Sequence, residues 1–557
     1  MQIDKILVSI FQRAFKSITD EMSISLTKTT RSPILCEAKD FVTGLYDAKG
    51  QMLEQTENLP ILSFSLGPVC KMILDLYGEE IYPGDVIIHN DVFSMGNQNN
   101  DVAIFKPIFV GDVLVGWSAA KGHQADIGGA VQGGYNPNAT EVWQEAIRIP
   151  ATKLYEKGKL RKDVWNLIFA NIRLNIVEQD IKAQIGACTL GERRLQAFVE
   201  KYGLEKFELH KQELFNSTEK MMRSEIQNIP NGIYEGKSMV YYDGKHPGSK
   251  FPIHVKVTVS DEDIEFDFSK SSPQTTGFVN GIYTSTCSAI TLTFLQMVNP
   301  NIPHNEGMIK PLKYIVLEGT ILNASYPAAT TFGNHLCPQI ADSIFKALSS
   351  AIPQRVTAGW NHLLCSLFTG NHPRTGRKYV DICFLGMKGG SGAMTGDDGY
   401  DHIGMIDASG GVLDQDYEMY EQQTPHLILK HEYLMDSAGA GKWRGGLGTE
   451  TIIKIGADHT KMVVFGDGDV KPAYGLKQGK ESILNIIELR YPNRKKHRPF
   501  SKDIVEDIPK NTLYYQVAGG GGGYGNPKDR PKEKVLEDVK NEVVSKKVAK
   551  EVYGVKC

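Results

Sequence analysis

Two polar, glycine-containing segments at the ends of a predicted β-hairpin constrain the fold of this chain more than any other feature. The first covers residues 90–101, and the second covers residues 122–129. Between them lie two apolar runs, 102–110 and 113–120, separated by a Gly-Asp turn. Apolar runs that alternate with turn residues are typical of antiparallel strands. The pattern therefore predicts a rigid hairpin that holds polar side chains at one end.

That end of the hairpin is a candidate site for polar chemistry. Because the two ends of a hairpin meet, Asp101 at the start of one strand and His123 just past the other are expected to lie close together. Asp126 adds a carboxylate shortly after His123. Residues 32–50 are interpreted as a second strand hairpin with Asp40 inside its first strand, where a carboxylate needs a cation or hydrogen-bond donors. Carboxylate and imidazole ligands from separate strands suit Mn, Fe or Zn, so a metal site is predicted, with a hydrogen-bonded structural histidine as the alternative.

The composition excludes several classes of protein. A chain of 557 residues exceeds the size of one hydrophobic core, so roughly two to four domains are expected. The net charge of −3 offers no footprint for nucleic acid, and the basic cluster at 494–498 is interpreted as a solvated loop. The eight cysteines include no CxxC pair, which favours reduced thiols. No signal peptide and no run of about 18 apolar residues is recognised, so a soluble cytoplasmic protein with no membrane segment is expected.

The periodicity of apolar residues indicates a fold of the α+β class. Val255 to Phe268 alternate across a turn, which predicts an antiparallel hairpin. Helical stripes predict helices over residues 3–18, 69–77, 163–173 (with Asp163 as N-cap), 181–202, 205–227, 285–297 and 337–350. We expect a multi-domain protein with mixed and antiparallel sheets and packed helices. Its expected parts are an N-terminal α+β domain with the metal site (1–215), a β-hairpin-rich middle domain (216–325), a glycine-rich α+β domain (326–530) and a charged helical tail (531–557).

Three glycine-rich segments, 388–399, 439–448 and 519–525, invite a comparison with phosphate-binding loops. Neither 439–448 nor 519–525 has the Gly-Lys-Ser/Thr of a P-loop or a dinucleotide fingerprint after a strand. Tight turns and close packing of the backbone are therefore the expected use of these glycines. No Gly-x-Ser-x-Gly elbow is found, which argues against a serine hydrolase. The Asn-His pairs at 334–335 and 361–362 are interpreted as loop or core residues.

Several long motifs, in this order, resemble the hydantoinase B family, the second component of ATP-dependent hydantoinases, oxoprolinases and ketone carboxylases. The resemblance runs from about Asp4 to Tyr553. The motifs that carry it are residues 90–101, 122–129, 144–150 (Gln-Glu-Ala-Ile-Arg-Ile-Pro), 170–173 (Ala-Asn-Ile-Arg), 436–448 and 519–527.

The resemblance implies a partner and a metal. The partner is a hydantoinase A type subunit with an actin-like kinase fold that binds ATP, so a hetero-oligomer is expected, and this agrees with the missing phosphate loop. The divalent metal (Mn, Zn or Fe) is held in the family by residues that match Asp40, Asp101 and His123, together with a histidine that Gln98 replaces here. An amide oxygen is a poorer ligand than imidazole for these metals. A weakened site, an altered metal preference and no metal are the three outcomes, and we expect a retained metal.

The family comparison implies hydrolysis of a small cyclic amide such as a hydantoin, oxoproline or lactam. The partner would phosphorylate the amide oxygen, and a metal-bound water of this chain, with Asp101 or Asp126 as base beside His123, would attack the activated carbon. One alternative is ATP-dependent carboxylation of a ketone with bicarbonate. The other alternative is a non-catalytic scaffold, in which Gln98 has ended the metal chemistry.

Overall fold

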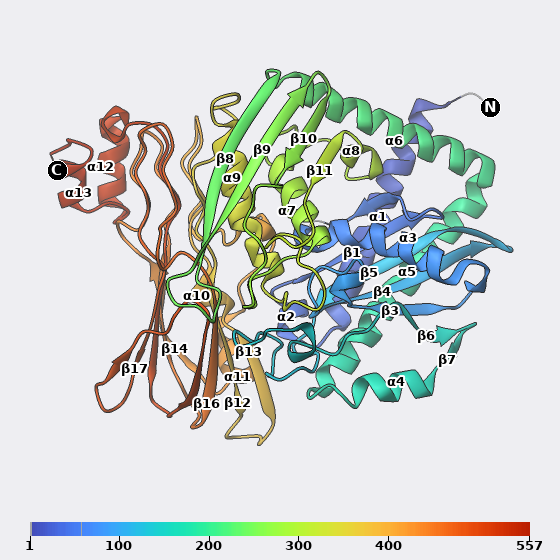
Figure 1. The fold of residues 1–557 in the computed structure, drawn as a ribbon, viewed down its shortest axis with the longest axis horizontal. Coiled ribbons are helices and arrows are strands. Elements are labelled where there is room, and N and C mark those ends of the chain that lie inside the picture. Colours follow the sequence, from blue (N-terminus) through green and yellow to red (C-terminus); the bar gives the residue numbers. More distant parts are fainter. Residues whose placement is uncertain (1–2, 57, 557) are drawn as a thin grey trace.

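Four β-sheets and the helices packed on them form the molecule, seen in a computed structural model that describes residues 3–56 and 58–556 (Figure 1). In Figure 1 the first sheet lies to the right, the second at the top, and the third and fourth at the lower left. Among the described strands, β10 and β11 form the one parallel pair, and all other pairs are antiparallel. The predicted α+β class with mixed and antiparallel sheets is confirmed.

The first sheet contains the predicted hairpin. Its seven strands lie in the order β2-β1-β5-β4-β3-β6-β7. Their bounds are β1 Phe41–Asp47, β2 Met52–Gln55, β3 Val86–His89, β4 Asp101–Val110, β5 Val113–His123, β6 Thr152–Glu156 and β7 Lys159–Leu160. Strands β4 and β5 are the expected hairpin, which is thereby confirmed. Helices α1 (Lys5–Thr29) and α5 (Asn175–Tyr202) pack against each other, and α5 also packs on β4 and β5.

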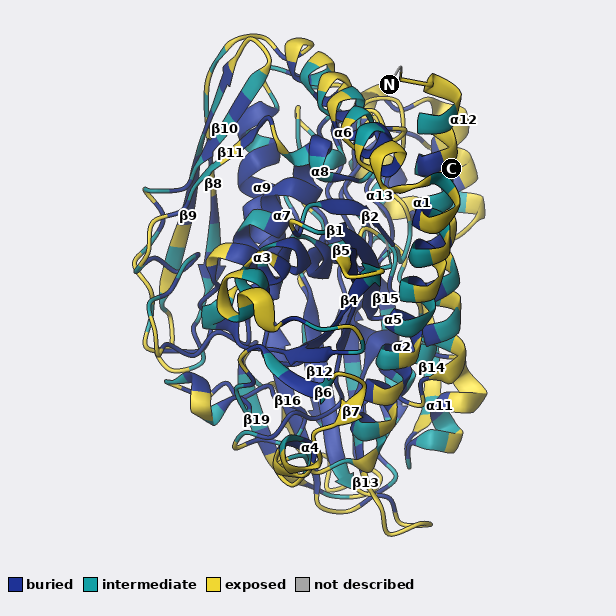
Figure 2. Cartoon of the chain, turned by 90° about the vertical axis from the view of Figure 1, so that its right-hand side faces the viewer, coloured by how far each residue is buried: buried dark blue, intermediate teal, exposed yellow. Residues whose placement is uncertain are grey.

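Helix α1 forms because its sequence provides both a cap and an apolar stripe. The carboxylate of Asp4 accepts a hydrogen bond from the N–H of Ile6 at 2.9 Å, which satisfies one of the free donors of the first turn. The helix is much longer than the predicted 3–18, and its buried face continues to Met22 and Leu26. Figure 2 shows the result, with an exposed outer face on α1 and the largely buried strands β1, β4 and β5 behind it.

The hairpin interpreted from residues 32–50 is present, because β1 pairs with β2 across the turn at Asp47–Gly50, but its first strand begins later than expected. Pro33–Cys36 forms the short helix α2, since proline is well suited to the first position of a helix. Lys39, with φ of 58°, then turns the chain before β1 begins at Phe41. Asp40 therefore lies just before the strand rather than inside it.

The second sheet confirms the hairpin predicted at 255–268. Its four strands lie in the order β11-β10-β9-β8, and α9 packs on β8 and β9. The strands are β8 Gly232–Tyr241, β9 Lys250–Ser260, β10 Asp263–Asp267 and β11 Leu312–Ile315. The helices around it are α6 Leu204–Gln227, α7 Tyr283–Leu295, α8 Glu306–Ile309 and α9 Cys337–Leu348.

The third and fourth sheets come from the last third of the chain, in the orders β13-β12-β16-β19 and β14-β15-β20-β17-β18. The strands are β12 Leu364–Asn371, β13 Lys378–Ile382, β14 Leu427–Tyr433, β15 Thr449–Lys454, β16 Thr460–Gly466, β17 Ile486–Arg490, β18 Lys496–His497, β19 Asp503–Ile508 and β20 Leu513–Ala518. The short helices α10 (Phe384–Met387) and α11 (Tyr417–Gln423) lie between them in sequence.

The remaining helices are α3 Leu66–Tyr77 and α4 Lys162–Phe169, with the 3-10 turns η1 Pro60–Ser65, η2 Gly78–Glu80, η3 Val92–Ser94, η4 Val142–Gln144, η5 Gly333–Leu336, η6 Ile406–Ala408 and η7 Pro527–Asp529. The N-cap of α4 is Arg161, so the prediction of Asp163 as a cap is wrong.

The segment Pro60–Glu80 is long and apolar enough to cross a membrane. It consists of η1, α3 and η2 in succession, and η1 packs on α7, as expected for a core segment.

The charged tail docks as two helices, α12 (Lys532–Lys540) and α13 (Lys546–Glu551). Val535, Val539, Val548 and Val552 belong to its apolar cluster, whereas Leu536 is exposed.

The three glycine-rich segments pack directly against one another. The N–H of Gly439 donates to the carbonyl of Gly521 at 2.8 Å, and the N–H of Gly446 donates to the carbonyl of Ser391 at 2.9 Å. A Cβ atom at Gly445 or Gly521 would overlap a backbone carbonyl oxygen of a neighbouring segment. The prediction of close backbone packing is confirmed, because side chains would hold these segments apart.

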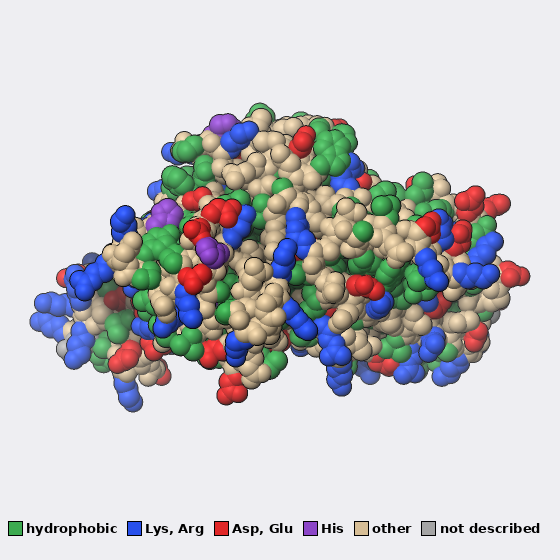
Figure 3. All heavy atoms as spheres, turned by 90° about the horizontal axis from the view of Figure 1, so that it is seen from below, with side chains coloured by type: hydrophobic (Ala, Val, Ile, Leu, Met, Phe, Trp, Pro, Cys, Tyr) green, Lys and Arg blue, Asp and Glu red, His purple; other side chains and the backbone are tan. Residues whose placement is uncertain are grey.

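The first sheet lies in the first predicted part, the second sheet in the second part, and the third and fourth sheets both lie in the third part, but one hydrophobic core joins them. The largest cluster of buried apolar side chains runs from Phe11 to Phe465. The domain boundaries at 215, 325 and 530 therefore stay a prediction. On the face shown in Figure 3, Lys and Arg side chains alternate with Asp and Glu, and no broad basic area is seen.

Replacement of Gly521 tests the packing of the glycine segments. Gly521→Ala places a methyl group against the carbonyl of Ser391, so we expect a loss of about 1–3 kcal/mol or more. Gly186→Ala in α5 is the matched control, because a Cβ there meets nothing within 4 Å and alanine favours a helix. The apparent Tm should fall for the first variant and hold or rise for the second. If Gly521→Ala had the same Tm as wild type, the proposed role of the close contact between Gly521 and Ser391 would be contradicted.

The buried carboxylate of Asp180 predicts a pH dependence of stability. One oxygen, Oδ1, accepts from the N–H of Arg31 at 2.7 Å, and burial raises the pKa of Asp180 to about 6. The folded state thus binds a proton that the unfolded state has already lost, so this group destabilises the fold as pH rises from about 4 to 6. The Tm of wild type should fall relative to that of Asp180→Asn as pH rises across this window, and the difference between them should then level off. A difference that is constant with pH would contradict the assignment.

Candidate metal centre

The ladder of strands β4 and β5 brings Asp101 and His123 together. The two residues are direct partners in the antiparallel register, at the open end of the hairpin. Their side chains meet as well, with His123 Nδ1 at 2.9 Å from Asp101 Oδ1, and both are buried. The expected proximity is observed, although His123 is the last residue of β5 rather than a residue past it.

Asp40 reaches the same place from the neighbouring strand. Its carbonyl accepts a hydrogen bond from the N–H of His123 at 3.1 Å, because β1 pairs with β5. Its carboxylate is buried, and Oδ1 has no hydrogen-bond partner among the described residues. The same holds for Nε2 of His123. An unpaired buried polar atom costs about 1–3 kcal/mol, so these two atoms indicate a ligand that pairs with them.

Burial governs the ionisation of this pair. It raises the pKa of Asp40 to about 7, with the attraction of His123 and the repulsion of Asp101 acting in opposite directions. Burial alone would lower the pKa of His123, but the hydrogen bond to Asp101 and the attraction of Asp40 outweigh it, so that pKa lies above its ordinary value. The group of Asp40, Asp101 and His123 therefore favours bound positive charge.

Gln98 lies beside the group, with its amide already bonded on both sides. Its Oε1 accepts from Asn334 Nδ2 at 2.9 Å, and its Nε2 donates to the hydroxyl of Tyr135 at 2.9 Å. The amide of Asn334 also donates to Asp101 Oδ2 at 2.8 Å. Gln98 is thus connected to Asp101 through Asn334. Oε1 of Gln98 can bind a metal only in addition to, or in place of, the hydrogen bond that it accepts from Asn334.

The segment at 333–335, interpreted from sequence as loop or core, provides two residues of the network. It forms η5, which places Asn334 against Asp101 and His335 against Tyr135, with Nε2 of His335 at 2.9 Å from the hydroxyl. Burial and the repulsion of His123 lower the pKa of His335 to about 3, so this ring is neutral. No local pattern in the sequence points to these contacts, because they join residues far apart in the chain. In the sequence, the Asn-His pair after Gly333 was the one signal that these residues could be functional.

Buried charges around the centre are unequal in number. Asp407, on η6, has an unpaired Oδ1, and burial together with the repulsion of Asp40 raises its pKa to about 7. Lys121 supplies a buried cation, whose Nζ donates to Asn97 Oδ1 at 2.8 Å. Three carboxylates, those of Asp40, Asp101 and Asp407, thus accompany one lysine and the imidazole of His123, which is paired with Asp101. Buried charges are normally paired or bound to a metal, so this excess favours a cation.

Asp126 occupies a different environment. Its Oδ1 accepts from Arg173 Nη1 at 3.0 Å and from the N–H of Gly133 at 3.2 Å, and its Oδ2 accepts from the N–H of Arg173 at 2.8 Å. The ion pair ties the loop after β5 to the residues before α5. The structure therefore does not bring Asp126 into the group of Asp40, Asp101 and His123.

The donor atoms fit a divalent metal in part. Asp40 Oδ1 and His123 Nε2 are free to bind one, whereas Asp101 and Gln98 are engaged in hydrogen bonds. Within the described residues, the group whose three ligand atoms already lie within 4.8 Å of one another is a different one, His402, Asp414 and His431. The four residues predicted as ligands are thus neighbours, and the ligand set itself stays a prediction.

A cavity of about 790 Å³ lies close to this region. Its walls include Ala125 and Arg173 from the first part of the chain and Arg377, Asp381 and Gln415 from the third. None of Asp40, Gln98, Asp101 and His123 lines it. We therefore do not assign it as the metal centre.

Comparison with known proteins identifies the class to which this fold and this group of residues belong. The sequence model of the hydantoinase B/oxoprolinase family matches residues 4–527, and the chain belongs to that family. It is 32% identical over 537 residues to the caprolactamase beta subunit of Pseudomonas jessenii, covering 95% of this chain and 92% of that protein. It is 30% identical to a putative D-/L-hydantoinase B subunit of Pseudomonas sp. (strain NS671), with 95% and 91% covered.

Solved structures show the same fold. The crystal structure of ATP-dependent caprolactamase from Pseudomonas jessenii has a TM-score of 0.93 and 31% identity, and the match covers 100% of this chain and 97% of that one. The nucleotide-free structure of acetone carboxylase has a TM-score of 0.91 at 20% identity, with 99% and 79% covered. At that identity the likeness to the carboxylase concerns the fold alone.

Asn334 provides a test of the network that holds Asp101 and Gln98. Asn334→Ala leaves Asp101 Oδ2 and Gln98 Oε1 without this donor, and loss of such an outer partner weakens metal binding about 10–100-fold. Titration with Mn²⁺ followed by electron paramagnetic resonance measures the effect. Asn301→Ala, in an exposed loop, is the control and should leave the affinity unchanged. Unchanged affinity in a folded Asn334→Ala protein would remove Asn334 from the site.

Proposed function

We propose that this chain is the subunit of an ATP-dependent enzyme in which a cyclic amide, such as a lactam, hydantoin or oxoproline, is hydrolysed. The observation that carries the proposal is the buried group of Asp40, Asp101 and His123 with its unpaired donor atoms. It occurs in a chain that matches the beta subunit of a caprolactamase over almost its whole length. The acetone carboxylase likeness supports the fold and adds no weight to carboxylation.

A divalent metal would be held by Asp40 and His123, with Asp101 and Gln98 beside them. When bound, such a metal lowers the pKa of a coordinated water towards neutrality and polarises a carbonyl oxygen. Mn, Zn and Fe are the metals that suit this set of ligands, and Gln98 shifts the preference towards harder ions.

The protein's own side chains prepare this centre. Asp101 receives the hydrogen bond of His123 at Nδ1, which fixes the ring so that Nε2 can face a metal. Asn334 and Asn97 donate to the second oxygen of Asp101 at 2.8 and 3.2 Å, so the carboxylate is held in place. Of the two predicted bases, Asp101 is the one that we propose, because it lies against His123, whereas the carboxylate of Asp126 is paired with Arg173.

ATP would be bound by a partner subunit of the hydantoinase A type. The relatives of this chain are named as subunits, one of them of a caprolactamase. The glycine-rich segments, which are the chain's nearest approach to a phosphate loop, are filled by backbone contacts with each other. We propose that the hetero-oligomer is cytoplasmic. The seven cysteines among the described residues are free, as is usual in a reducing compartment, and Cys557 lies outside the described residues.

The test is ATP hydrolysis by the complex of this chain with its hydantoinase A type partner, over a panel of cyclic amides and ketones. Turnover should require a cyclic amide, and His123→Ala or Asp101→Ala should lower it about 100-fold or more while the complex stays assembled. The matched control is the exposed pair of His459 and Asp507, whose Nδ1–Oδ1 distance is 2.6 Å. Alanine at either of these residues should leave turnover unchanged.

Three results would point away from cyclic amide hydrolysis. Labelled bicarbonate in the product of a ketone would show the carboxylase alternative. Purified protein without metal, together with full activity of the His123→Ala complex, would show a scaffold. ATP hydrolysis that ignores every cyclic amide would contradict the proposed substrate class.

A further inference from the structure

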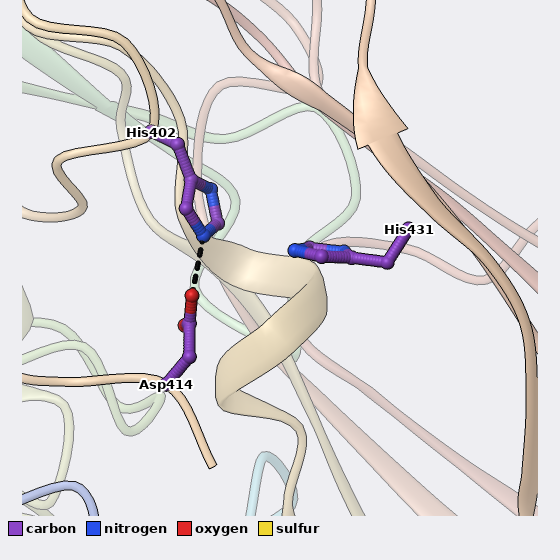
Figure 4. A group of neighbouring side chains, drawn as sticks. All are labelled: His402, Asp414 and His431. Atoms are coloured by element: carbon purple, nitrogen blue, oxygen red, sulfur yellow. Dashed lines mark hydrogen bonds and ion pairs between the residues drawn. The ribbon is translucent and has the colours of Figure 1, made fainter. Parts of the chain in front are cut away.

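A second cluster of metal-binding side chains lies in the last third of the chain. His402 follows the first glycine-rich segment, Asp414 lies in the loop before α11, and His431 is on β14 (Figure 4). One atom of each, a ring nitrogen or a carboxylate oxygen, lies within 4.8 Å of the others. These residues belong to neither the predicted site nor the network around Asp101.

Each imidazole is held by an outer partner. His402 bonds through Nδ1 to the carbonyl oxygen of Lys388 at 3.1 Å, so this nitrogen carries the proton and Nε2 faces Asp414 Oδ2 at 2.6 Å. His431 bonds through Nδ1 to the hydroxyl of Thr451 at 2.9 Å. Its other ring nitrogen points towards the pair of His402 and Asp414 (Figure 4). Histidines that bind metals are oriented in this way, with one nitrogen bonded to the protein and the other free.

The rings of His402 and His431 lie close together. Their centroids are 5.1 Å apart, and the rings are steeply inclined to each other, at 68°. Burial and the repulsion of His402 lower the pKa of His431 to about 4, so His431 is a neutral ring with an available lone pair at ordinary pH. A neutral imidazole is the form that binds a metal.

We propose that His402, Asp414 and His431 form a site for a divalent transition metal of the zinc type. Two imidazoles and one carboxylate are a common set of three protein ligands for zinc, and a water completes four-coordination. The ion would take the place of the proton shared by His402 Nε2 and Asp414 Oδ2, so binding releases a proton. The ligands are partly exposed, which gives an ion access from solvent.

Lys388 sets a limit on the coordination. Its Nζ lies 3.1 Å from Asp414 Oδ1 and therefore occupies the oxygen that His402 does not use. Asp414 would bind the metal through Oδ2 alone. The nearby cation would also weaken binding, which suits an exchangeable ion more than a permanently bound one.

The position of the cluster indicates what the ion would do. His402 follows the glycine-rich segment 388–399, and His431 belongs to the edge strand of the fourth sheet, next to β15. A metal ion bound by both histidines and by Asp414 would hold the loop of residues 402–414 against that sheet. Metal binding should therefore stabilise the fold of the last third of the chain, with no dependence on the chemistry proposed for Asp101 and His123.

The test is the zinc content of the full chain after removal of metals and dialysis against Zn²⁺. His431→Gln and Asp414→Asn should each lower the content by one zinc per chain relative to wild type, whatever the Asp101 site holds. His459→Gln, an exposed histidine also paired with an aspartate, is the matched control and should leave the content unchanged. Zn²⁺ should raise the apparent Tm of wild type more than that of the two variants.

Spectroscopy adds a readout that does not depend on activity. Co²⁺ in place of zinc should give the intense visible bands of a tetrahedral site, and these should disappear in His431→Gln. Asp414→Asn provides the same comparison if His431→Gln does not fold. Equal zinc content in wild type and both variants, or an equal loss in the His459→Gln control, would overturn the proposal. Because the count is a difference between variants, its failure leaves the proposed amide hydrolysis untouched.

Discussion

The antiparallel ladder between β4 and β5 is the interaction on which the candidate site depends. Its register makes Asp101 and His123 partners at the end of the hairpin, and the pairing of β1 with β5 adds Asp40 beside them. A shift by one residue would turn every side chain of a strand to the other face. The ladder therefore fixes both the buried core on one side and the polar group at the end. The hydrogen bond between the two side chains then follows from the backbone.

A second constraint comes from the packing of glycine backbones in the last third of the chain. Segments 388–399, 439–448 and 519–525 approach one another so closely that a single Cβ would displace a neighbour. Hydrogen bonds between their main chains replace the side-chain packing of an ordinary core. This explains the glycine-rich sequence without any bound nucleotide. It also gives the third and fourth sheets a rigid common support, next to which His402 and His431 meet.

The distribution of buried charge distinguishes the two clusters of ligands. Around Asp101, several carboxylates share one lysine, and amides from Asn97 and Asn334 hold the acidic groups. Around Asp414, one carboxylate faces two histidines and a lysine, which makes the second group less anionic. We propose a divalent metal for the first arrangement and zinc for the second. At the first, Gln98 stands where the family comparison implies a histidine.

The sequence by itself determined the α+β class, the hairpin of β4 and β5, the family, and the proximity of Asp101 to His123. These follow from apolar periodicity and turn residues, which act over short distances along the chain. The prediction that Asp40 lies inside a strand was wrong, because the helical turn at Pro33–Cys36 and the positive φ of Lys39 outweighed the strand-like composition. Only the tertiary structure decided that Asn334 and His335 join the site, that Arg173 engages Asp126, and that His402, Asp414 and His431 converge. Such contacts join residues that are far apart in the chain, and no local pattern in one sequence encodes them.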